Sequence, residues 1–541
     1  MAKAELPGFP LPLNLYDYSC RATDRFPHVL RLTDMGDEYV RKLCTYRELL
    51  IMRVLNSITD KPGWYLEVFD EATTAKWRRE IAASDEEITP NMVRWIMDEV
   101  KWKAQKYSAT GHVVVFDSGV VKSDTAISDE LQNALKEGVR ILEDSLTGKD
   151  CHPGSDDKVA DLVDPSLFPV VFNRTRAISD SLIKLERSLD IIGHGTVLLS
   201  DTREHPWFSN RKQYSWEFQW LPCDVDLLDN GLCAIVSYIN NLHPRQNARL
   251  YRVIEKIIAQ AIPLWNTTLT YTKRGYWRME CPRLVEYDDS DSDYDSSEGR
   301  RLRPVGIFQE TGLQIIVKLV NIELTPEKPE YHGGSWHVQG RLNEHICASA
   351  IYYYDSDNIT EGTLSFRQRA FTDLAIWDNM KEIYQLLQDI YDFPVGIYES
   401  ESIDVTQELG SVVTKEGRLL TFANILQHRE SPFSLEDRSR PGHRKILALL
   451  LVDPHLRIIS SSNVPPQRED WAIEREMTIQ QALRSLPQEL KDMVYANLDF
   501  AYMTMEEAKG FRLRLIEERR SAAVTQNEYF ETTIMPHPEL Y

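Results

Sequence analysis

Apolar residues recur with helical spacing near the start of the chain. The positions that share this face are Val93, Ile96, Met97 and Val100. Because residues three and four apart lie on one side of a helix, this spacing predicts a helix with one buried face. Thr89 followed by Pro90 is typical of a first helical turn, where a capping side chain and a proline are both favoured. We expect residues 1–110 to form a mainly helical N-terminal region.

Residues 111–286 combine both kinds of pattern, and we expect a mixed α/β region that packs on the core. A short apolar run at 112–116 predicts a strand, and leucines spaced between 131 and 142 predict a helix. Apolar positions between 250 and 261 predict a second, stronger helix. We expect it to end near Pro263, because proline interrupts a helix.

Two polar stretches carry metal-ligand residue types without the spacing of a metal site. The stretch Cys151-His-Pro-Gly-Ser-Asp-Asp has one histidine and two aspartates but no period, so we expect a solvated loop. Residues 287–301 carry six acids between 288 and 298, which resembles the alternating acids of a calcium loop. The central glycine and closing glutamate of such a loop are not at the right offsets. We therefore expect a flexible acidic loop.

Residues 303–462 change to short apolar runs separated by turn residues. We expect strands at 313–324, 346–354, 363–366, 395–398, 419–422 and 445–452, with one helix at 372–390. Many short strands without long helices between them favour a sandwich or a barrel.

Residues 470–541 return to helical spacing and predict a helical C-terminal region. Ser485 with Gln488, and Thr504 with Glu507, have the spacing of capping boxes at two helix starts.

Charge and cysteine usage narrow the function classes. The 541 residues carry 62 basic and 83 acidic side chains, a net charge of −21. Such a surface repels phosphates, so we expect no nucleic-acid partner and no membrane surface as partner. The seven cysteines are scattered without a Cys-x-x-Cys pair, no apolar run approaches a membrane span, and no signal peptide is evident. A reduced, cytoplasmic protein is the simplest interpretation.

Three features of the strand-rich region fit one chemistry. His337 and Gln339 lie two residues apart, so on a strand both point to one side. His428 follows 91 residues later, and Arg444 opens the next predicted strand 16 residues after it. Two histidines and one oxygen ligand form the facial triad of non-haem Fe(II) oxygenases, with positions open for a 2-oxo acid and dioxygen. A buried arginine suits the far carboxylate of that co-substrate, because guanidinium binds carboxylate with two parallel hydrogen bonds.

Motifs along nearly the whole chain also resemble a known family. They are Ile58-Thr-Asp-Lys-Pro-Gly-Trp, Ser123-Asp-Thr, His152-Pro-Gly-Ser-Asp, Ser237-Tyr-Ile-Asn-Asn-Leu-His-Pro, Val317-Lys-Leu-Val-Asn-Ile-Glu-Leu-Thr-Pro-Glu-Lys-Pro-Glu-Tyr331, Gly333-Gly-Ser-Trp-His337, Leu342-Asn-Glu-His, Tyr352-Tyr-Tyr-Asp and Pro441-Gly-His-Arg-Lys-Ile-Leu-Ala. They resemble a large, mostly fungal family long classed as a domain of unknown function, whose barrel is similar to that of Fe(II)/2-oxoglutarate-dependent oxygenases. Fungal amino-acid pathway enzymes of this type include oxygenases that close an aziridine ring on L-valine on the way to 2-aminoisobutyrate. The resemblance implies a role in fungal secondary metabolism.

One residue departs from the family pattern. That pattern reads His-Val-Glu-Gly, whereas this chain has Gln339 in place of the glutamate. A glutamine binds iron only through its neutral amide oxygen, which should weaken Fe(II) affinity. Three interpretations are open. Gln339 is a working ligand that retunes the iron, or the site is catalytically silent. Alternatively, Gln339 replaces a natural glutamate in order to trap a complex. Glu344 is an alternative acid, but its odd offset on an extended strand ranks it below Gln339.

We therefore expect an α+β protein with a double-stranded β-helix (jelly-roll, cupin-like) core, acting as an Fe(II)/2-oxoglutarate-dependent oxygenase. His337, Gln339 and His428 would hold the metal, and Arg444 would bind 2-oxoglutarate. The substrate would be a small molecule such as an amino acid, hydroxylated or closed into an aziridine at an unactivated C–H bond. Candidate substrate-binding residues near the motif strands are Arg341, Asn343, Glu344 and Arg367. The alternatives are a catalytically silent binding protein and an oxygenase that acts on a protein side chain.

Overall fold

The computed structural model describes residues 26–31, 41–42, 44–84, 87–145, 148–200, 213–229, 231–272, 312–371, 406–472, 481, 483–497 and 502–531. These residues combine helices with mainly antiparallel sheets. The expected acidic loop at 287–301, helix at 372–390 and strand at 395–398 lie outside the described residues. None of the described helices has both the length and the apolarity that crossing a membrane requires.

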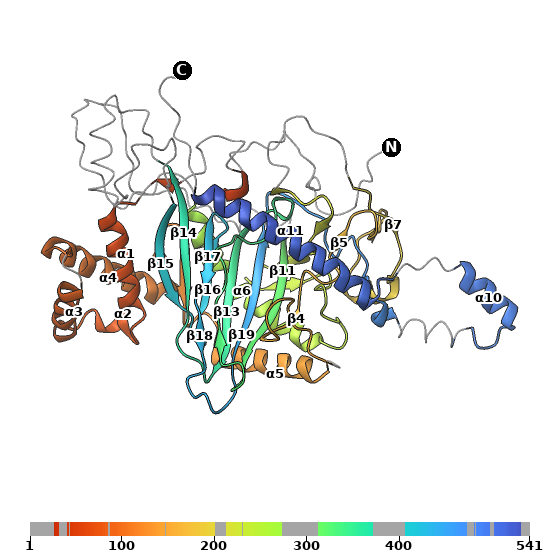
Figure 1. Ribbon diagram of the computed structural model, residues 1–541, viewed down its shortest axis with the longest axis horizontal. Helices are drawn as coiled ribbons and strands as arrows, with labels where there is room; N and C mark the ends of the chain where they lie inside the picture. Colours follow the sequence, from red (N-terminus) through yellow and green to blue (C-terminus); the bar gives the residue numbers. More distant parts are fainter. Residues whose placement is uncertain are drawn as a thin grey trace, which may run out of the picture.

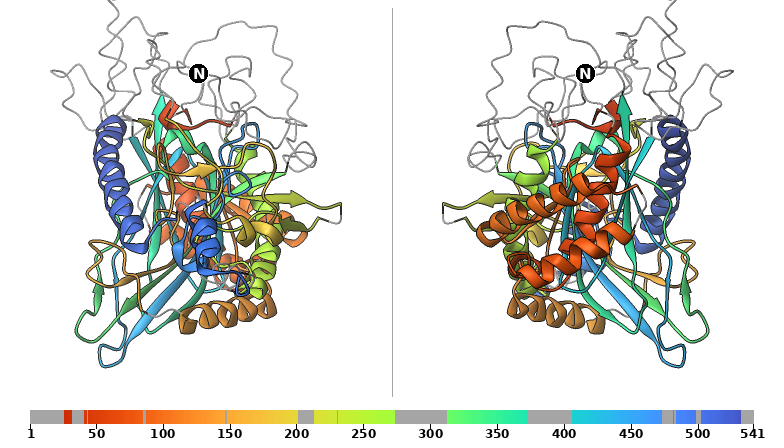
Figure 2. Two further views of the ribbon diagram at one scale, coloured as in Figure 1. Left: turned by 90° about the vertical axis from the view of Figure 1, so that its right-hand side faces the viewer. Right: turned by 90° about the vertical axis from the view of Figure 1, so that its left-hand side faces the viewer.

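The predicted N-terminal helices are present and pack on one another. They are α1 (Tyr46–Thr59), α2 (Trp64–Glu67), α3 (Glu71–Ser84) and α4 (Pro90–Thr110). Thr89 caps α4, because its hydroxyl accepts a hydrogen bond from the Met92 N–H at 3.3 Å. The predicted face is confirmed, with Ile96, Met97 and Val100 buried in a core that α1–α4 share. Figure 2 shows these helices together on one side of the sheets.

A large sheet forms the centre of the described structure (Figure 1). Its order is β10-β9-β11-β19-β13-β16-β3-β2, and β4 also pairs with β11. The strands are β2 (Val113–Phe116), β3 (Val120–Ser123), β4 (Val159–Val163), β9 (Cys223–Leu227), β10 (Cys233–Ile235), β11 (Leu313–Leu324), β13 (Ile346–Asp357), β16 (Leu419–Ala423) and β19 (Gly442–Val452). The strand predictions within these bounds are confirmed.

A small sheet packs against one face of the large sheet. It contains β1 (Arg41–Lys42), β14 (Thr363–Phe371), β15 (Thr406–Val413) and β17 (Leu426–Glu430). Only two residues separate β16 from β17, so the chain passes from the large sheet to the small sheet at Asn424. The rings of Phe366 and Phe422 meet between the sheets at 5.1 Å. We call this face of the large sheet its inner face.

Two helices cover the outer face of the large sheet. These are α5 (Asp129–Ser145), as predicted, and α6 (Ala248–Thr270). The prediction that α6 ends near Pro263 is wrong, because the helix continues seven residues further. Proline removes one backbone hydrogen bond and costs about 3 kcal/mol in a helix interior. Burial of Leu264, Trp265 and Leu269 in the core beyond it offsets that cost.

The C-terminal helix α11 (Met505–Glu531) covers the inner face where the small sheet does not reach. Thr504 caps it as predicted, accepting from the Glu507 N–H at 3.1 Å, whereas the Glu507 carboxylate pairs with Arg174. Leu515 packs with Ile316 and Leu450 of the inner face. Figure 1 shows α11 lying across the strands.

The predicted cap at Ser485 is wrong, because α10 (Gln488–Asn497) begins at Gln488, the residue that was expected to close the capping box within the first turn.

The remaining short elements are η2 (Val29–Arg31), β5 (Val170–Val171), β6 (Arg176–Ala177), η4 (Leu185–Ile191), β7 (Thr196–Val197), β8 (Phe218–Gln219), β12 (Glu330–Tyr331), η6 (Leu342–Glu344) and β18 (Phe433–Ser434).

Candidate functional site

His337 and His428 lie side by side, with His428 on β17 of the small sheet. They exchange two backbone hydrogen bonds, of 3.2 Å and 3.0 Å, as an isolated antiparallel bridge. Their ring centres are 4.3 Å apart. Phe422 packs on His428 from the other side, with ring centres 4.6 Å apart. Residues 91 positions apart in sequence therefore form one pair of imidazoles against an apolar wall.

Both imidazoles are held in the neutral form that binds metals. Burial lowers the pKa of His337, and burial together with His337 lowers the pKa of His428 well below its ordinary value. The Ser335 carbonyl lies 2.9 Å from Nδ1 of His337 and can only accept. Nδ1 therefore carries the hydrogen, and Nε2 keeps a lone pair. This is the usual arrangement of a metal-binding histidine.

The Gln339 side chain contacts His428. Its side-chain amide nitrogen lies 3.2 Å from Nε2 of His428, and a half turn of the amide places Oε1 there. Asn424 fixes the backbone of Gln339 on both sides, since it accepts from the N–H at 2.9 Å and donates to the carbonyl at 2.9 Å. Asn424 also donates to the Ile346 carbonyl. It therefore ties the crossover between the sheets to the Gln339 segment.

The geometry of these three residues fits a metal ion. Two donor atoms about 2.1 Å from one ion, at a right angle, lie about 3.0 Å apart, and two such imidazoles have centres roughly 4.6 Å apart. The observed separations of 3.2 Å and 4.3 Å are close to these values. Nδ1, on the other side of the His428 ring from Gln339, has no hydrogen-bond partner among the described residues, so this ring lacks the orienting contact that Ser335 gives His337. The donor set therefore fits Fe(II), with a neutral amide as its weakest member.

Arg444 lies buried on β19 of the large sheet, which faces β17. Its guanidinium lies 3.3 Å from Glu430 and 4.2 Å from the Phe433 ring centre. Glu430 follows His428 by two residues on β17, which is about 6.6 Å along a strand. Nε of Arg444 is buried and has no hydrogen-bond partner within the part of the chain that the structure describes. Burial raises the pKa of Glu430, although Arg444 acts to lower it.

The expectation that His337 and Gln339 lie on a regular strand is wrong. Only His337 makes a bridge, and the backbone around it is irregular. Gly333 has φ +82°, and a Cβ there would lie 2.7 Å from the Glu430 carbonyl oxygen. This close approach to β17, rather than a strand period, brings both side chains to His428.

Glu344 is fully committed to other contacts. It lies on the 3₁₀-helix η6, so the odd-offset argument for an extended strand does not apply to it. Its carboxylate accepts from the Trp220 N–H at 2.7 Å, the Arg341 N–H at 2.7 Å and the Arg519 side chain at 2.6 Å. These contacts direct it away from the two imidazoles.

The other candidate substrate-binding residues face neighbouring protein segments. Asn343 bonds the backbone of Ser215 and Phe218. Arg367 donates to Gln427 at 2.6 Å and approaches the end of α11. Arg341 lies 3.6 Å from Glu518 of α11. These hydrogen bonds and ion pairs are the contacts of residues that attach covering segments, and the substrate role stays a prediction.

Sequence reasoning did not single out Lys318. Strand alternation places it on the inner face between Ile316, which α11 covers, and Val320, which packs between the two sheets. It lies 3.9 Å from Asp161, and its charge acts to lower the pKa of His337. The signal in the sequence that could have identified Lys318 is a charged residue within an otherwise apolar strand.

A family model described as protein of unknown function DUF4246 matches residues 90–475, and a model of the N-terminal domain of DUF4246 matches residues 6–80. None of the curated proteins matches the chain in sequence.

Three solved structures show weak likenesses, from which we draw no conclusion. IDO from Bacillus thuringiensis is 10% identical over 65% of this chain and 94% of its own, with a TM-score of 0.25. A bsmA homolog from Methylobium petroleophilum PM1 is 10% identical over 65% and 92%, with a TM-score of 0.24. The Fe(II)/α-ketoglutarate-dependent dioxygenase TqaL is 11% identical over 70% and 98%, with a TM-score of 0.26.

Proposed function

The chain belongs to the DUF4246 family of proteins of unknown function, and we propose that it is an Fe(II)- and 2-oxoglutarate-dependent oxygenase of a small molecule. One observation carries the proposal. His428 lies beside both His337 and Gln339, and the buried Arg444 lies on the facing large sheet. When bound, iron with 2-oxoglutarate and dioxygen would supply the oxidising power for an unactivated C–H bond.

The residues of the chain have separate roles in this proposal. His337 and His428 donate neutral nitrogens, and Gln339 donates an amide oxygen. Arg444 binds the far carboxylate of 2-oxoglutarate with its planar fork, in place of its single 3.3 Å contact with Glu430. Phe422 and Phe433 exclude water around the two polar groups.

The two facing sheets support a double-stranded β-helix as the core. The short passage from β16 to β17 at Asn424 is the kind of crossing between sheets that this fold requires. It places His428 on the small sheet and Arg444 on the large sheet, on opposite walls of one interior.

The cover of the inner face favours a small-molecule substrate over a protein side chain. α11 reaches from Arg174 near its start to Gln427 near its end, where Asn527 accepts from the Gln427 amide at 2.9 Å. A helix held at both ends leaves less room for a docked protein than for a free metabolite. The resemblance in sequence favours an amino acid, either hydroxylated or cyclised. We propose a cytoplasmic location, where thiols such as those of Cys151, Cys223 and Cys233 stay reduced.

Gln339 favours a second candidate, a binding protein without iron chemistry. The amide replaces a charged ligand with a neutral one, and its contact with His428 satisfies that ring in part without metal. Formation of succinate that depends on the chain separates the two candidates, because a binding protein makes none.

An anaerobic Fe(II) titration with 2-oxoglutarate present tests the proposal. The full chain, freed of metal by a chelator, should bind one Fe(II) and develop visible charge-transfer absorption. His428→Ala should weaken Fe(II) binding at least tenfold. His443→Ala is the matched control, because this histidine lies on β19 against Asp355 at 3.1 Å, outside the candidate site. Failure of the wild-type chain to bind Fe(II), or equal binding in His428→Ala, contradicts the proposal.

A further inference from the structure

A second group of potential metal ligands lies away from the His337–His428 pair. One ligand atom from each of His152, Asp161 and Asp164 lies within 4.8 Å of the others. The polar stretch around His152, which we expected to be only a solvated loop, forms a short hairpin with β4. The His152 N–H donates to the Val159 carbonyl at 2.8 Å, and the Asp161 N–H donates to the Asp150 carbonyl at 2.9 Å. These bonds hold the histidine against the aspartates.

Both aspartates are buried with one oxygen left over. The side chains of Asp161 and Asp164 are 0% and 2% exposed. Oδ2 of Asp161 contacts Nδ1 of His152 at 2.8 Å, and Oδ1 of Asp164 accepts from the Ser166 N–H at 2.9 Å. The other two oxygens, Oδ1 of Asp161 and Oδ2 of Asp164, are buried and accept no hydrogen bond from any residue that the structure describes. A buried carboxylate oxygen without a partner is costly, so two in one cluster indicate a missing cation.

The nearby cations neutralise the pair only in part. They face the same two oxygens at ion-pair distance, with Nζ of Lys318 3.9 Å from Oδ1 of Asp161 and the Arg512 guanidinium 3.5 Å from Oδ2 of Asp164. Arg512 gives its two short contacts, of 2.6 Å and 3.0 Å, to Asp150. Burial and the adjacent Asp161 raise the pKa of Asp164, which is the behaviour of two carboxylates that repel each other.

We infer that His152, Asp161 and Asp164 form a second divalent-cation site, suited to a transition ion such as Mn²⁺ or Zn²⁺. One imidazole with two carboxylates is the mixed nitrogen and oxygen donor set that such ions accept. The observed 2.8 Å between Nδ1 of His152 and Oδ2 of Asp161 is close to the roughly 3.0 Å between neighbouring ligands of one ion. A cation here would tie the hairpin to the wall of the large sheet.

Mn²⁺ binding in a His337→Ala background tests the inference independently of the proposed function. The full chain with this substitution should retain one Mn²⁺, counted by equilibrium dialysis and by the EPR signal of free Mn²⁺. Asp164→Asn in the same background should weaken that binding at least tenfold. Asp156→Asn is the matched control, because this exposed aspartate of the same hairpin pairs with Lys158 and Lys328. It should leave Mn²⁺ binding unchanged.

A second measurement covers the case in which Asp164→Asn does not fold. Pulsed EPR of Mn²⁺ in the His337→Ala background should show coupling to one imidazole nitrogen, and His152→Gln, at a half-buried position, should remove it. No bound Mn²⁺ in the background variant overturns the inference. Mn²⁺ binding that neither Asp164→Asn nor His152→Gln changes also overturns it.

Discussion

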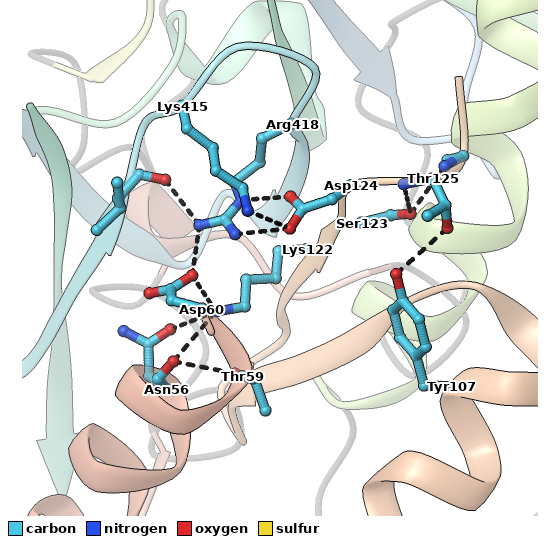
Figure 3. Close-up of polar contacts among 12 residues, drawn as sticks. Asn56, Thr59, Asp60, Tyr107, Lys122, Ser123, Asp124, Thr125, Lys415 and Arg418 are labelled. Carbon is cyan, nitrogen blue, oxygen red and sulfur yellow. Dashed lines mark hydrogen bonds and ion pairs between the residues drawn. The ribbon is translucent and has the colours of Figure 1, made fainter. Parts of the chain in front are cut away.

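We expect Lys122 to make the free energy of unfolding depend on pH. Substitution of Lys122 alone should remove this contribution. Figure 3 shows it within a cluster of charges between α1 and the large sheet. Its ammonium lies 2.7 Å from Asp60 and 2.9 Å from the side-chain oxygen of Asn56. Arg418 contacts the same Asp60 oxygen at 2.7 Å and binds Asp124 with two hydrogen bonds. Lys122 is only 2% exposed.

Burial lowers the pKa of Lys122 from 10.5 to about 7, against the opposing attraction of Asp60. The folded chain therefore holds this proton less tightly than the unfolded chain. Between pH 7 and 10.5 the unfolded state binds more protons, so the free energy of unfolding rises with pH. One group with these two pKa values contributes about 2 kcal/mol more at pH 9 than at pH 7, since each pKa unit corresponds to about 1.4 kcal/mol.

Urea unfolding of the wild-type chain and of Lys122→Met at pH 7 and pH 9 measures this contribution. Other groups titrate in both proteins, so the difference between the proteins isolates Lys122. We expect wild type to gain about 2 kcal/mol on the variant between these pH values. Lys415→Met is the matched control, because Lys415 binds Asp124 at 2.8 Å from an exposed position. The same pH dependence in wild type and Lys122→Met would refute the reasoning.

Three further predictions concern the candidate iron site. Gln339→Glu should tighten Fe(II) binding roughly tenfold in an anaerobic titration with 2-oxoglutarate, because it adds a negative ligand at nearly constant volume; equal affinity would remove Gln339 from the coordination sphere. Arg444→Lys should raise the 2-oxoglutarate concentration needed for half-saturation roughly tenfold, because lysine lacks the bidentate fork; an unchanged requirement would count against the anchor role. Asn424→Ala should destabilise the chain by about 2–4 kcal/mol in urea and loosen Fe(II) binding, because it leaves the half-buried Gln339 backbone and the buried Ile346 carbonyl without the Asn424 amide; unchanged unfolding would show that water replaces the amide.

Much of the fold could be predicted because its signals are local. The strand expected at 313–324 has the bounds of β11, since a continuous apolar run with both faces covered is unambiguous. The cap at Thr89 depends on two adjacent residues and was also predictable. The predictions at Pro263 and Ser485 were wrong because the outcome at these positions does not depend on local sequence alone. At Pro263, packing of the following turn offsets the local cost of proline, and only the tertiary structure shows that packing.

The candidate site, like the fold, was predictable where the signal is local and was not predictable where it depends on tertiary contacts. His337, Gln339, His428 and Arg444 could be proposed from residue type and order, and the structure brings the first three together. The reason given for their closeness was wrong, because Gly333 and the single bridge to β17 replace the expected strand.

His152, Asp161 and Lys318 could not be grouped from the sequence, because the pairing of β4 with β11 brings together segments more than 150 residues apart. That pairing sets Asp161 opposite Val320, two residues beyond Lys318 and on the same face. The charge of Lys318 on the inner face thus acts on both the His152 cluster and His337. Residue types in the sequence identify candidate metal ligands, whereas strand register decides which charged side chains lie close to those ligands.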